Sequence, residues 1–152
     1  MTKYKEALKI LEERFGCDTL ISLATIADNQ PYVRIVDGYY RDRAFYVITH
    51  RLSNKMKQIG KAPQVAVCGE WFTALGKAVD VGHPLDAEHR QLIETLREVF
   101  SSWYSNGHVD EVDTNTCILK VELLSGVLYN QGCRYELDFV NGTLLNNDLE
   151  SE

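Results

Sequence analysis

The stretch "TLISLATIADNQPYVRIVDGYYRDRAFYVITH" (19–50) decides the fold of this chain. It contains three runs rich in apolar and β-branched residues, at 19–27, 32–40 and 44–50. The polar corners "DNQP" and "RDR" separate these runs. Short apolar runs joined by tight polar turns are typical of antiparallel strands that follow one another in a sheet. The sequence therefore predicts a three-stranded antiparallel meander here.

The rest of the chain adds helices and further strands. Apolar residues recur at helical spacing in three segments, which we predict to be helices: 3–15, 53–60 and 86–101, the last with Asp86 as its N-cap. Four segments have the pattern of strands, of which the first two could also be one long bent hairpin: 63–72, 73–82, 116–132 and 134–139. An Asn141-Gly142 pair then predicts a hairpin turn. Six or seven antiparallel strands with flanking helices indicate an α+β protein, mainly β, and a small barrel fits this size.

The composition is that of one globular domain. The chain has 152 residues, of which 45% are hydrophobic and 25% are charged. The N-terminal segment lacks a signal-peptide core, and no apolar run approaches the ~20 residues of a membrane-spanning helix. The formal net charge of −6 argues against a general nucleic-acid or anionic-membrane partner, although a small anionic ligand is compatible with it. We therefore expect no nucleic acid and no membrane among the partners.

The four cysteines give no sign of a metal site. Cys17, Cys68, Cys117 and Cys133 form no C-x-x-C pair, and their spacing fits no zinc pattern. Reduced thiols are the usual state of cysteine in the cytoplasm. We therefore expect a cytoplasmic protein with free thiols and without a bound metal.

The segment "ITHRLSNKMKQIG" (48–60) combines hydroxyls and cations where a strand ends and a helix begins. Ser53 stands at the N-cap position and Lys55 in the first helical turn. Taken alone, the serine is most often a helix cap and the lysine a solvated surface charge. The alternative is an anion site for a phosphate group, because a helix N-terminus favours negative charge.

The ordered set of motifs between residues 20 and 82 resembles a known family. These motifs are "LATIADNQPYVRIVDGYY", "FYVITHRLSNKMKQIGKAPQVAV" and "GEWFTALGKA". They are similar to the pattern of the FMN-binding split barrel of the pyridoxamine 5′-phosphate oxidase-like family, including its general-stress-protein branch of small bacterial members. The resemblance implies a split β-barrel with flanking helices over residues 1–145 and a flexible tail at 146–152.

The resemblance also implies a homodimer with FMN at the subunit interface. The residues it implies as flavin contacts are Arg34 and Lys55 at the phosphate, Thr49 and Ser53 as hydroxyl donors to it, the backbone of Ile35 and Val36 beside the isoalloxazine ring, and Trp71 near the flavin. The chemistry of these residue types agrees with the assignment. An arginine can bind a phosphate through two donors, and a lysine acts on it as a point charge.

The function implied is that of a flavoprotein, with oxidoreductase activity on an unidentified small molecule. The end of the chain, "RYELDFVNGTLLNNDLESE", lacks the Arg-x-His-type substrate segment of true pyridoxamine 5′-phosphate oxidases, so that reaction is not expected. One alternative is a non-catalytic flavin carrier or stress sensor. Another is a haem-binding split barrel, which would need His50, His83 or His108 as an axial ligand. The sequence assigns no role to His50, His108, Arg134 or Tyr135.

Overall fold

The computed structural model describes residues 1–146 of the chain. Within this range the strands are β1 Thr19–Ala27, β2 Gln30–Arg41, β3 Ala44–His50, β4 Gln64–Gly69, β5 Phe72–Gly82, β6 Thr116–Asn130, β7 Cys133–Asp138 and β8 Thr143–Leu144. The helices are α1 Lys3–Phe15, α2 Asn54–Lys61 and α3 Arg90–Val99, with a 3₁₀ turn at Ala87–His89 and a π-helical turn at Tyr104–His108. The predicted meander is thus present as β1, β2 and β3.

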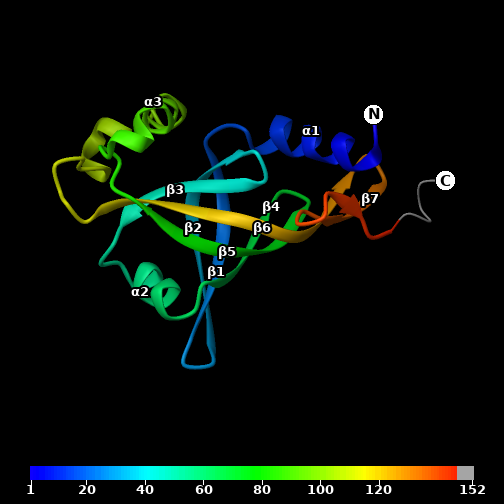
Figure 1. The fold of residues 1–152 in the computed structure, drawn as a ribbon, viewed down its shortest axis with the longest axis horizontal. Coiled ribbons are helices and arrows are strands. Elements are labelled where there is room, and N and C mark those ends of the chain that lie inside the picture. Colours follow the sequence, from blue (N-terminus) through cyan, green and yellow to red (C-terminus); the bar gives the residue numbers. More distant parts are fainter. Residues whose placement is uncertain (147–152) are drawn as a thin grey trace.

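All eight strands form one antiparallel sheet, in the order β3-β2-β1-β4-β5-β6-β7-β8. A further pairing joins β3 to β6, with Thr49 opposite Cys117 and Phe45 opposite Val121, and closes the first six strands into a barrel. The long strand β6 then leaves β3 and pairs with β7, beginning with Ser125 opposite Asp138. This double use of β6 splits the barrel and confirms the predicted α+β split-barrel fold (Figure 1).

Side chains from alternate positions of the strands fill the barrel. Phe45 is fully buried, and its ring lies 5.7 Å from the rings of both Phe15 and Tyr40. Helix α1 covers one end of this core with Phe15, whereas α2 covers the other end with Met56 and Ile59 (Figure 1). The two helices explain why so short a barrel is closed to water at both ends.

The outer surface of the barrel has one covered side and one open side. Helix α3 and the residue that follows it pack Leu96 and Phe100 over the outward face that includes Ile118 of β6. The outer face of β1, β4 and β5, together with β6 and β7, instead bears a groove of about 550 Å³, and no residue of a described helix lines it. Val33 and Leu75 line this groove with 69% and 59% of their surface exposed. A contiguous exposed apolar surface of this kind is unusual for a strand face in contact with water, and it is typical of interaction sites.

The structure corrects several predicted boundaries. The strand break predicted between residues 72 and 73 lies at Glu70 and Trp71, which leaves Phe72 paired with Gly69 and buried. The predicted helix 86–101 begins with a 3₁₀ turn, because the Asp86 carboxylate accepts from the backbone N–H of His83 and does not cap the helix.

The C-terminal hairpin has the predicted turn. Gly142 has a φ of +69°, and its N–H donates to the carbonyl of Asp138. The turn leads into the short strand β8. Asn146, which the sequence predicts to begin a flexible tail, is buried, and its side chain bonds the backbone of Arg134 and Glu136 in β7. The remainder of that predicted tail, 147–152, lies outside the described residues.

None of the helices within residues 1–146 is both long enough and apolar enough to cross a membrane.

The π-helical turn is attached to the barrel by polar contacts. The indole N–H of Trp103 donates to the Asp18 carboxylate over 2.9 Å. Burial, a hydrogen bond with Asp18 and the charge of Asp18 together raise the pKa of the Asp37 carboxyl to about 6, although the nearby His108 acts in the opposite direction. The Asp37 carboxyl therefore keeps its proton to a higher pH in the folded protein than in the unfolded chain.

Removing the central ring of the core should destabilise the barrel. We expect Phe45→Ala to lower the free energy of unfolding by ~3–5 kcal/mol, because it leaves a cavity among packed rings. Val140→Ala is the control, since this side chain is 70% exposed and surface changes usually stay within ~0.5 kcal/mol. Urea denaturation followed by circular dichroism measures both. Equal effects of the two substitutions would contradict the proposed core.

The Asp18–Asp37 pair should make stability depend on pH. A raised folded-state pKa means that the proton on Asp37 stabilises the fold fully below about pH 4, and that this stabilisation disappears as the pH rises through about 6. We expect Asp37→Asn, which cannot ionise, to gain stability relative to the unmodified chain as the pH increases across this interval. Denaturation midpoints on either side of the interval test the prediction. A difference that does not change with pH would refute it.

Candidate functional site

Arg34 lies at the α2 end of the barrel and bridges β1 and α2. Its Nη1 donates to the carbonyl of Leu23 over 3.2 Å and to Oγ1 of Thr25 over 2.7 Å. Its Nη2 donates to Oε1 of Gln58 over 3.0 Å. Burial lowers the pKa of the Arg34 guanidinium, and no carboxylate forms an ion pair with it among residues 1–146. A cation is thus held by neutral acceptors alone.

Lys55 brings a second cation to the same end of the barrel. Burial is the main cause that lowers the pKa of its ammonium group, and the positive charge of Arg34 lowers it further. The nearest potential anion, the thiol of Cys117, is fully buried, and its pKa is raised to about 11, so it stays neutral at physiological pH. Within the described part of the chain, Lys55 has no ion-pair partner.

Ser53 precedes α2 but does not cap it through its side chain. Its backbone has the extended conformation of an N-cap residue, with φ −66° and ψ 157°. Its Oγ is shielded from solvent and has no hydrogen-bond partner among the described residues. The capping interpretation therefore holds for the backbone of Ser53 and is wrong for its hydroxyl. A buried hydroxyl without a partner costs roughly 1–3 kcal/mol, so a hydrogen bond from Ser53 to an acceptor would be favourable.

Thr49 lies at the end of β3 opposite Cys117, on the side of the strand that faces the barrel interior. The chain continues from Thr49 through a short turn to Ser53 and α2. The first N–H groups of an α-helix have no acceptor within the helix, and they point along its axis beyond the N-terminus. The start of α2 thus brings the Ser53 hydroxyl, free backbone amides and the Lys55 ammonium to the end of β3, and Arg34 contacts the same helix through Gln58.

This arrangement is chemically suited to an anion. Two partly buried cations without counter-ions repel each other, and an anion between them would relieve both the repulsion and the desolvation. The positive end of the helix dipole adds to the same field. The set of donors resembles those that hold phosphate groups at helix N-termini.

Two residues of this network have no role predicted from the sequence. Thr25 is 1% exposed, and its hydroxyl donates to Oε1 of Gln58 over 2.6 Å. Thr25 is the one polar residue in the inward row of Ile21, Leu23 and Thr25, which is a signal that the sequence offered. Gln58 stands one helical turn after Lys55, a spacing that places both on one face of α2.

Of the remaining predicted flavin contacts, Ile35 and Val36 follow Arg34 on β2, and Trp71 is distant from the cations. Ile35 is 67% exposed on the outer face of β2, whereas Val36 packs against the core. Trp71 occupies the β4–β5 turn, at the end of the barrel covered by α1, where Arg14 donates to the carbonyl of Glu70. The structure thus brings Arg34, Thr49, Ser53 and Lys55 to the α2 end of the barrel and places Trp71 at the α1 end.

Two of the three histidines considered as haem ligands have both ring nitrogens in hydrogen bonds. His50 contacts the Asp113 carboxylate through Nε2 and the N–H of Leu52 through Nδ1. His83 contacts the carbonyl of Asp113 and the N–H of Leu85. His108 has no such bond within residues 1–146, and its ring lies edge-on to Trp103 at 6.4 Å. An axial role for His50 or His83 would break existing bonds.

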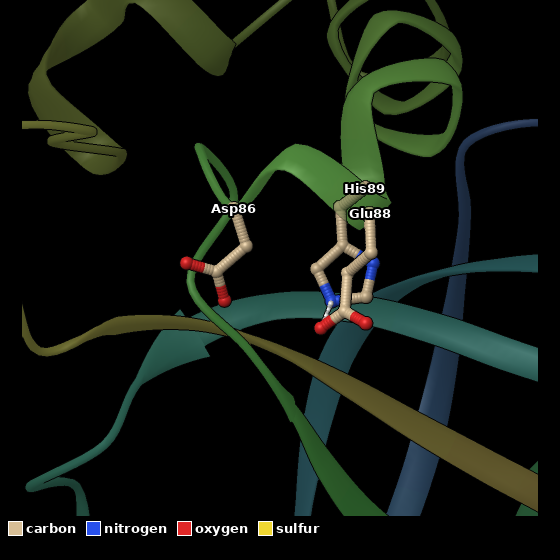
Figure 2. A group of neighbouring side chains, drawn as sticks. All are labelled: Asp86, Glu88 and His89. Carbon is tan, nitrogen blue, oxygen red and sulfur yellow. Dashed lines mark ion pairs between the residues drawn. The ribbon is translucent and has the colours of Figure 1, made fainter.

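Asp86, Glu88 and His89 have potential ligand atoms within 4.8 Å of one another (Figure 2). Their hydrogen bonds explain this cluster without a metal. The Asp86 carboxylate accepts from the N–H of His83, and Nε2 of His89 lies 2.7 Å from the carbonyl of Val81. A carbonyl accepts only, so this nitrogen carries a proton and cannot coordinate a metal.

Tyr135 and Arg134, which the sequence left without a role, make contacts within the chain. The hydroxyl of Tyr135 donates to the Glu6 carboxylate over 3.0 Å and so attaches α1 to β7. Arg134 forms an ion pair with Glu136 and donates to the hydroxyl of Tyr129. Arg134 and Glu136 both line the outer groove.

Comparison with known proteins identifies the fold. No family model matches the chain, and a search of curated proteins found no match. Among solved structures, general stress protein 26 from Bacillus anthracis is similar with a TM-score of 0.64 and 19% identity over 90% of this chain and 100% of that one. A pyridoxamine 5′-phosphate oxidase-related, FMN-binding protein from Nostoc punctiforme has a TM-score of 0.55 and 16% identity over 90% and 89%.

A third similar structure is a haem-binding protein from Mycobacterium smegmatis, with a TM-score of 0.67 and 10% identity. It covers 92% of this chain, which spans 60% of that longer protein. At these identities the likeness concerns the arrangement of the backbone. This chain therefore has the split-barrel fold that pyridoxamine 5′-phosphate oxidase-related, FMN-binding proteins and general stress protein 26 share.

Proposed function

We propose that this chain is a flavoprotein of the pyridoxamine 5′-phosphate oxidase-like family that binds FMN with its phosphate at the start of α2. One observation carries the proposal. Arg34 and Lys55 are partly buried and near enough for their charges to interact, without a carboxylate partner in residues 1–146, and the shielded hydroxyl of Ser53, the N-cap residue of α2, has no partner in this range either. A phosphate dianion supplies the two charges and the acceptors that these groups lack.

The flavin ring would extend from this phosphate along β2. In that arrangement the backbone of Ile35 and Val36 borders the ring, and an apolar strand face buries the ring without many polar contacts. The outer face of β2 and its neighbours is suited to this role, because Val33 and Ile35 expose apolar surface there. Trp71 would reach a flavin only at the opposite end of the barrel or across a subunit interface.

The proposed assembly is a homodimer with FMN at the interface. The outer groove of about 550 Å³ lies on the side of the barrel that no described helix covers. Exposed apolar patches of this kind mark interaction sites. A second copy of the chain on this face would cover both the groove and the ring, and it would bring the Trp71 of each chain into the neighbourhood of the other.

The proposed activity is oxidoreduction of a small molecule. When bound, the flavin supplies hydride or electron transfer. The chain itself holds the phosphate through Lys55 and Arg34, orients the ring along β2, and excludes water through the partner surface. In this proposal no side chain of the chain acts as a nucleophile.

Two other functions give different results in the same assays. A non-catalytic flavin carrier or sensor binds FMN but does not turn over with reduced nicotinamide cofactors. A haem protein shows a Soret band, and His108 would then be its candidate ligand, because His50 and His83 are already bonded.

Removing the Lys55 ammonium should weaken FMN binding selectively. A hydrogen bond to a charged group contributes ~1.5–3 kcal/mol, so we expect Lys55→Ala to raise the Kd for FMN roughly tenfold to a hundredfold. Riboflavin lacks the phosphate, and its Kd should change little. Quenching of flavin fluorescence during titration measures both.

Lys57→Ala is the matched control, because Lys57 is an exposed lysine on the same helix. It should leave the Kd for FMN within about twofold, a change of roughly 0.4 kcal/mol. The phosphate assignment fails if Lys55→Ala and Lys57→Ala bind FMN equally well. The flavoprotein proposal fails if the unmodified protein binds neither flavin.

A charge placed in the outer groove should prevent dimer formation. We expect Leu75→Asp to convert a dimer into a monomer, because a partner surface would bury the new carboxylate without compensation. Val112→Asp is the control, since Val112 is 87% exposed outside the groove. Sedimentation velocity distinguishes the two states. A dimer that persists in Leu75→Asp would place the interface elsewhere.

A further inference from the structure

The hydrogen bonds around Gln58 single out this residue at the candidate phosphate site. Its Oε1 accepts from Thr25 Oγ1 over 2.6 Å and from Arg34 Nη2 over 3.0 Å. Thr25 Oγ1 in turn accepts from Arg34 Nη1 over 2.7 Å. The three side chains form a closed triangle that joins β1, β2 and α2.

Chemistry fixes the orientation of the Gln58 amide within this triangle. A guanidinium has only donors, so the amide atom facing Arg34 is the oxygen. The Thr25 hydroxyl accepts a hydrogen bond from Arg34, so its own O–H is the donor to the Gln58 oxygen. The Nε2 group of Gln58 is therefore directed away from the triangle, and it has no acceptor within the described range.

The same triangle limits what Arg34 can still donate. Both hydrogens of Nη1 are used, by Leu23 and Thr25, and one hydrogen of Nη2 is used by Gln58. The Nε hydrogen and the second Nη2 hydrogen are left for a ligand. Arg34 can thus bind an anion without giving up a bond to the protein, and its orientation is set before the anion arrives.

We infer that Gln58 is a positioning residue for the phosphate of FMN, which holds Arg34 through its oxygen and presents its amide nitrogen to the same phosphate. Lys55 lies one helical turn before it, so both side chains project from one face of α2. The inference rests on the proposed function. It adds the Gln58 amide to the donors of the site, and it makes Thr25 and Gln58 responsible for the orientation of Arg34.

The substitution Gln58→Glu tests whether a charge at this position affects the phosphate. Glutamate keeps an acceptor for Arg34 and Thr25, so the triangle and the fold are retained. It replaces the amide donor by a carboxylate that repels phosphate. We expect the Kd for FMN to rise more than tenfold in Gln58→Glu, whereas the Kd for riboflavin stays within about twofold. A purely structural Gln58 predicts no change in this ratio in Gln58→Ala, which removes the amide without adding a charge.

Gln58→Ala and Gln64→Ala complete the test. Gln58→Ala frees Arg34 and should also lower the preference for FMN over riboflavin. Gln64 is exposed at the start of β4, and its replacement should change neither constant. Thermal denaturation of each variant without ligand shows whether it is folded. An unchanged ratio of FMN to riboflavin affinity in folded Gln58→Ala would overturn the inference.

Inorganic phosphate, used as a second ligand, tests the role of Gln58 independently of flavin binding. Inorganic phosphate should raise the melting temperature of the unmodified protein, and this increase should be smaller in Gln58→Glu. If the protein binds no flavin but this phosphate effect is present and sensitive to Gln58, the flavin proposal fails and the anion-site role of Gln58 stands. If phosphate has no effect and no flavin binds, both fail.

Discussion

The antiparallel pairing of β3 with β6 is the constraint on which the rest of the structure depends. It turns an open sheet into a barrel and fixes the end of β3 beside the start of β6, with His50 opposite Thr116. Because the chain leaves β3 at this point and enters α2 after a short turn, closure determines where the helix begins. The turn is further held by Arg51, which bonds the Asp80 carboxylate and the carbonyl of Thr114. The N-terminus of α2 is thereby fixed relative to Arg34 on β2.

Closure of the barrel also desolvates the Arg34 guanidinium, and the residues of the site compensate this loss of hydration only in part. A guanidinium directed to the barrel interior loses hydration, and the interior offers no carboxylate within the described chain. Neutral acceptors from Leu23, Thr25 and Gln58 replace part of the lost water. They do not balance the charge, and Lys55 adds to it. The Asp18–Asp37 pair has the opposite sign and lies elsewhere, against the π-helical turn, so it cannot compensate these cations.

Local sequence patterns predicted the helices and strands. They did not predict the side-chain contacts between segments that are distant in the sequence. The meander over 19–50 and the position of Ser53 and Lys55 at a helix start follow from neighbouring residues. The triangle of Thr25, Arg34 and Gln58 does not, because it depends on α2 packing across the end of β1. The strand break at Trp71 was missed for a similar reason. Trp71 has a φ of +53°, an unfavourable value for a bulky residue, and the contact of Arg14 with Glu70 contributes to holding this turn.

The inner and outer faces of β2 differ in polarity, and this difference gives a physical reason for the proposed dimer. Arg34 faces inward with its donors at the barrel end, while Val33 and Ile35 face outward and expose apolar surface. A ligand held by its phosphate at the barrel end and lying along β2 would leave one side of its ring in water if the chain were alone. Binding sites for ligands of this size normally bury most of the ligand surface. In the proposed dimer the second copy would supply the missing cover, and the ring would add apolar area to the interface. Cofactor binding and association of the chains are then linked, so each should strengthen the other by the same factor.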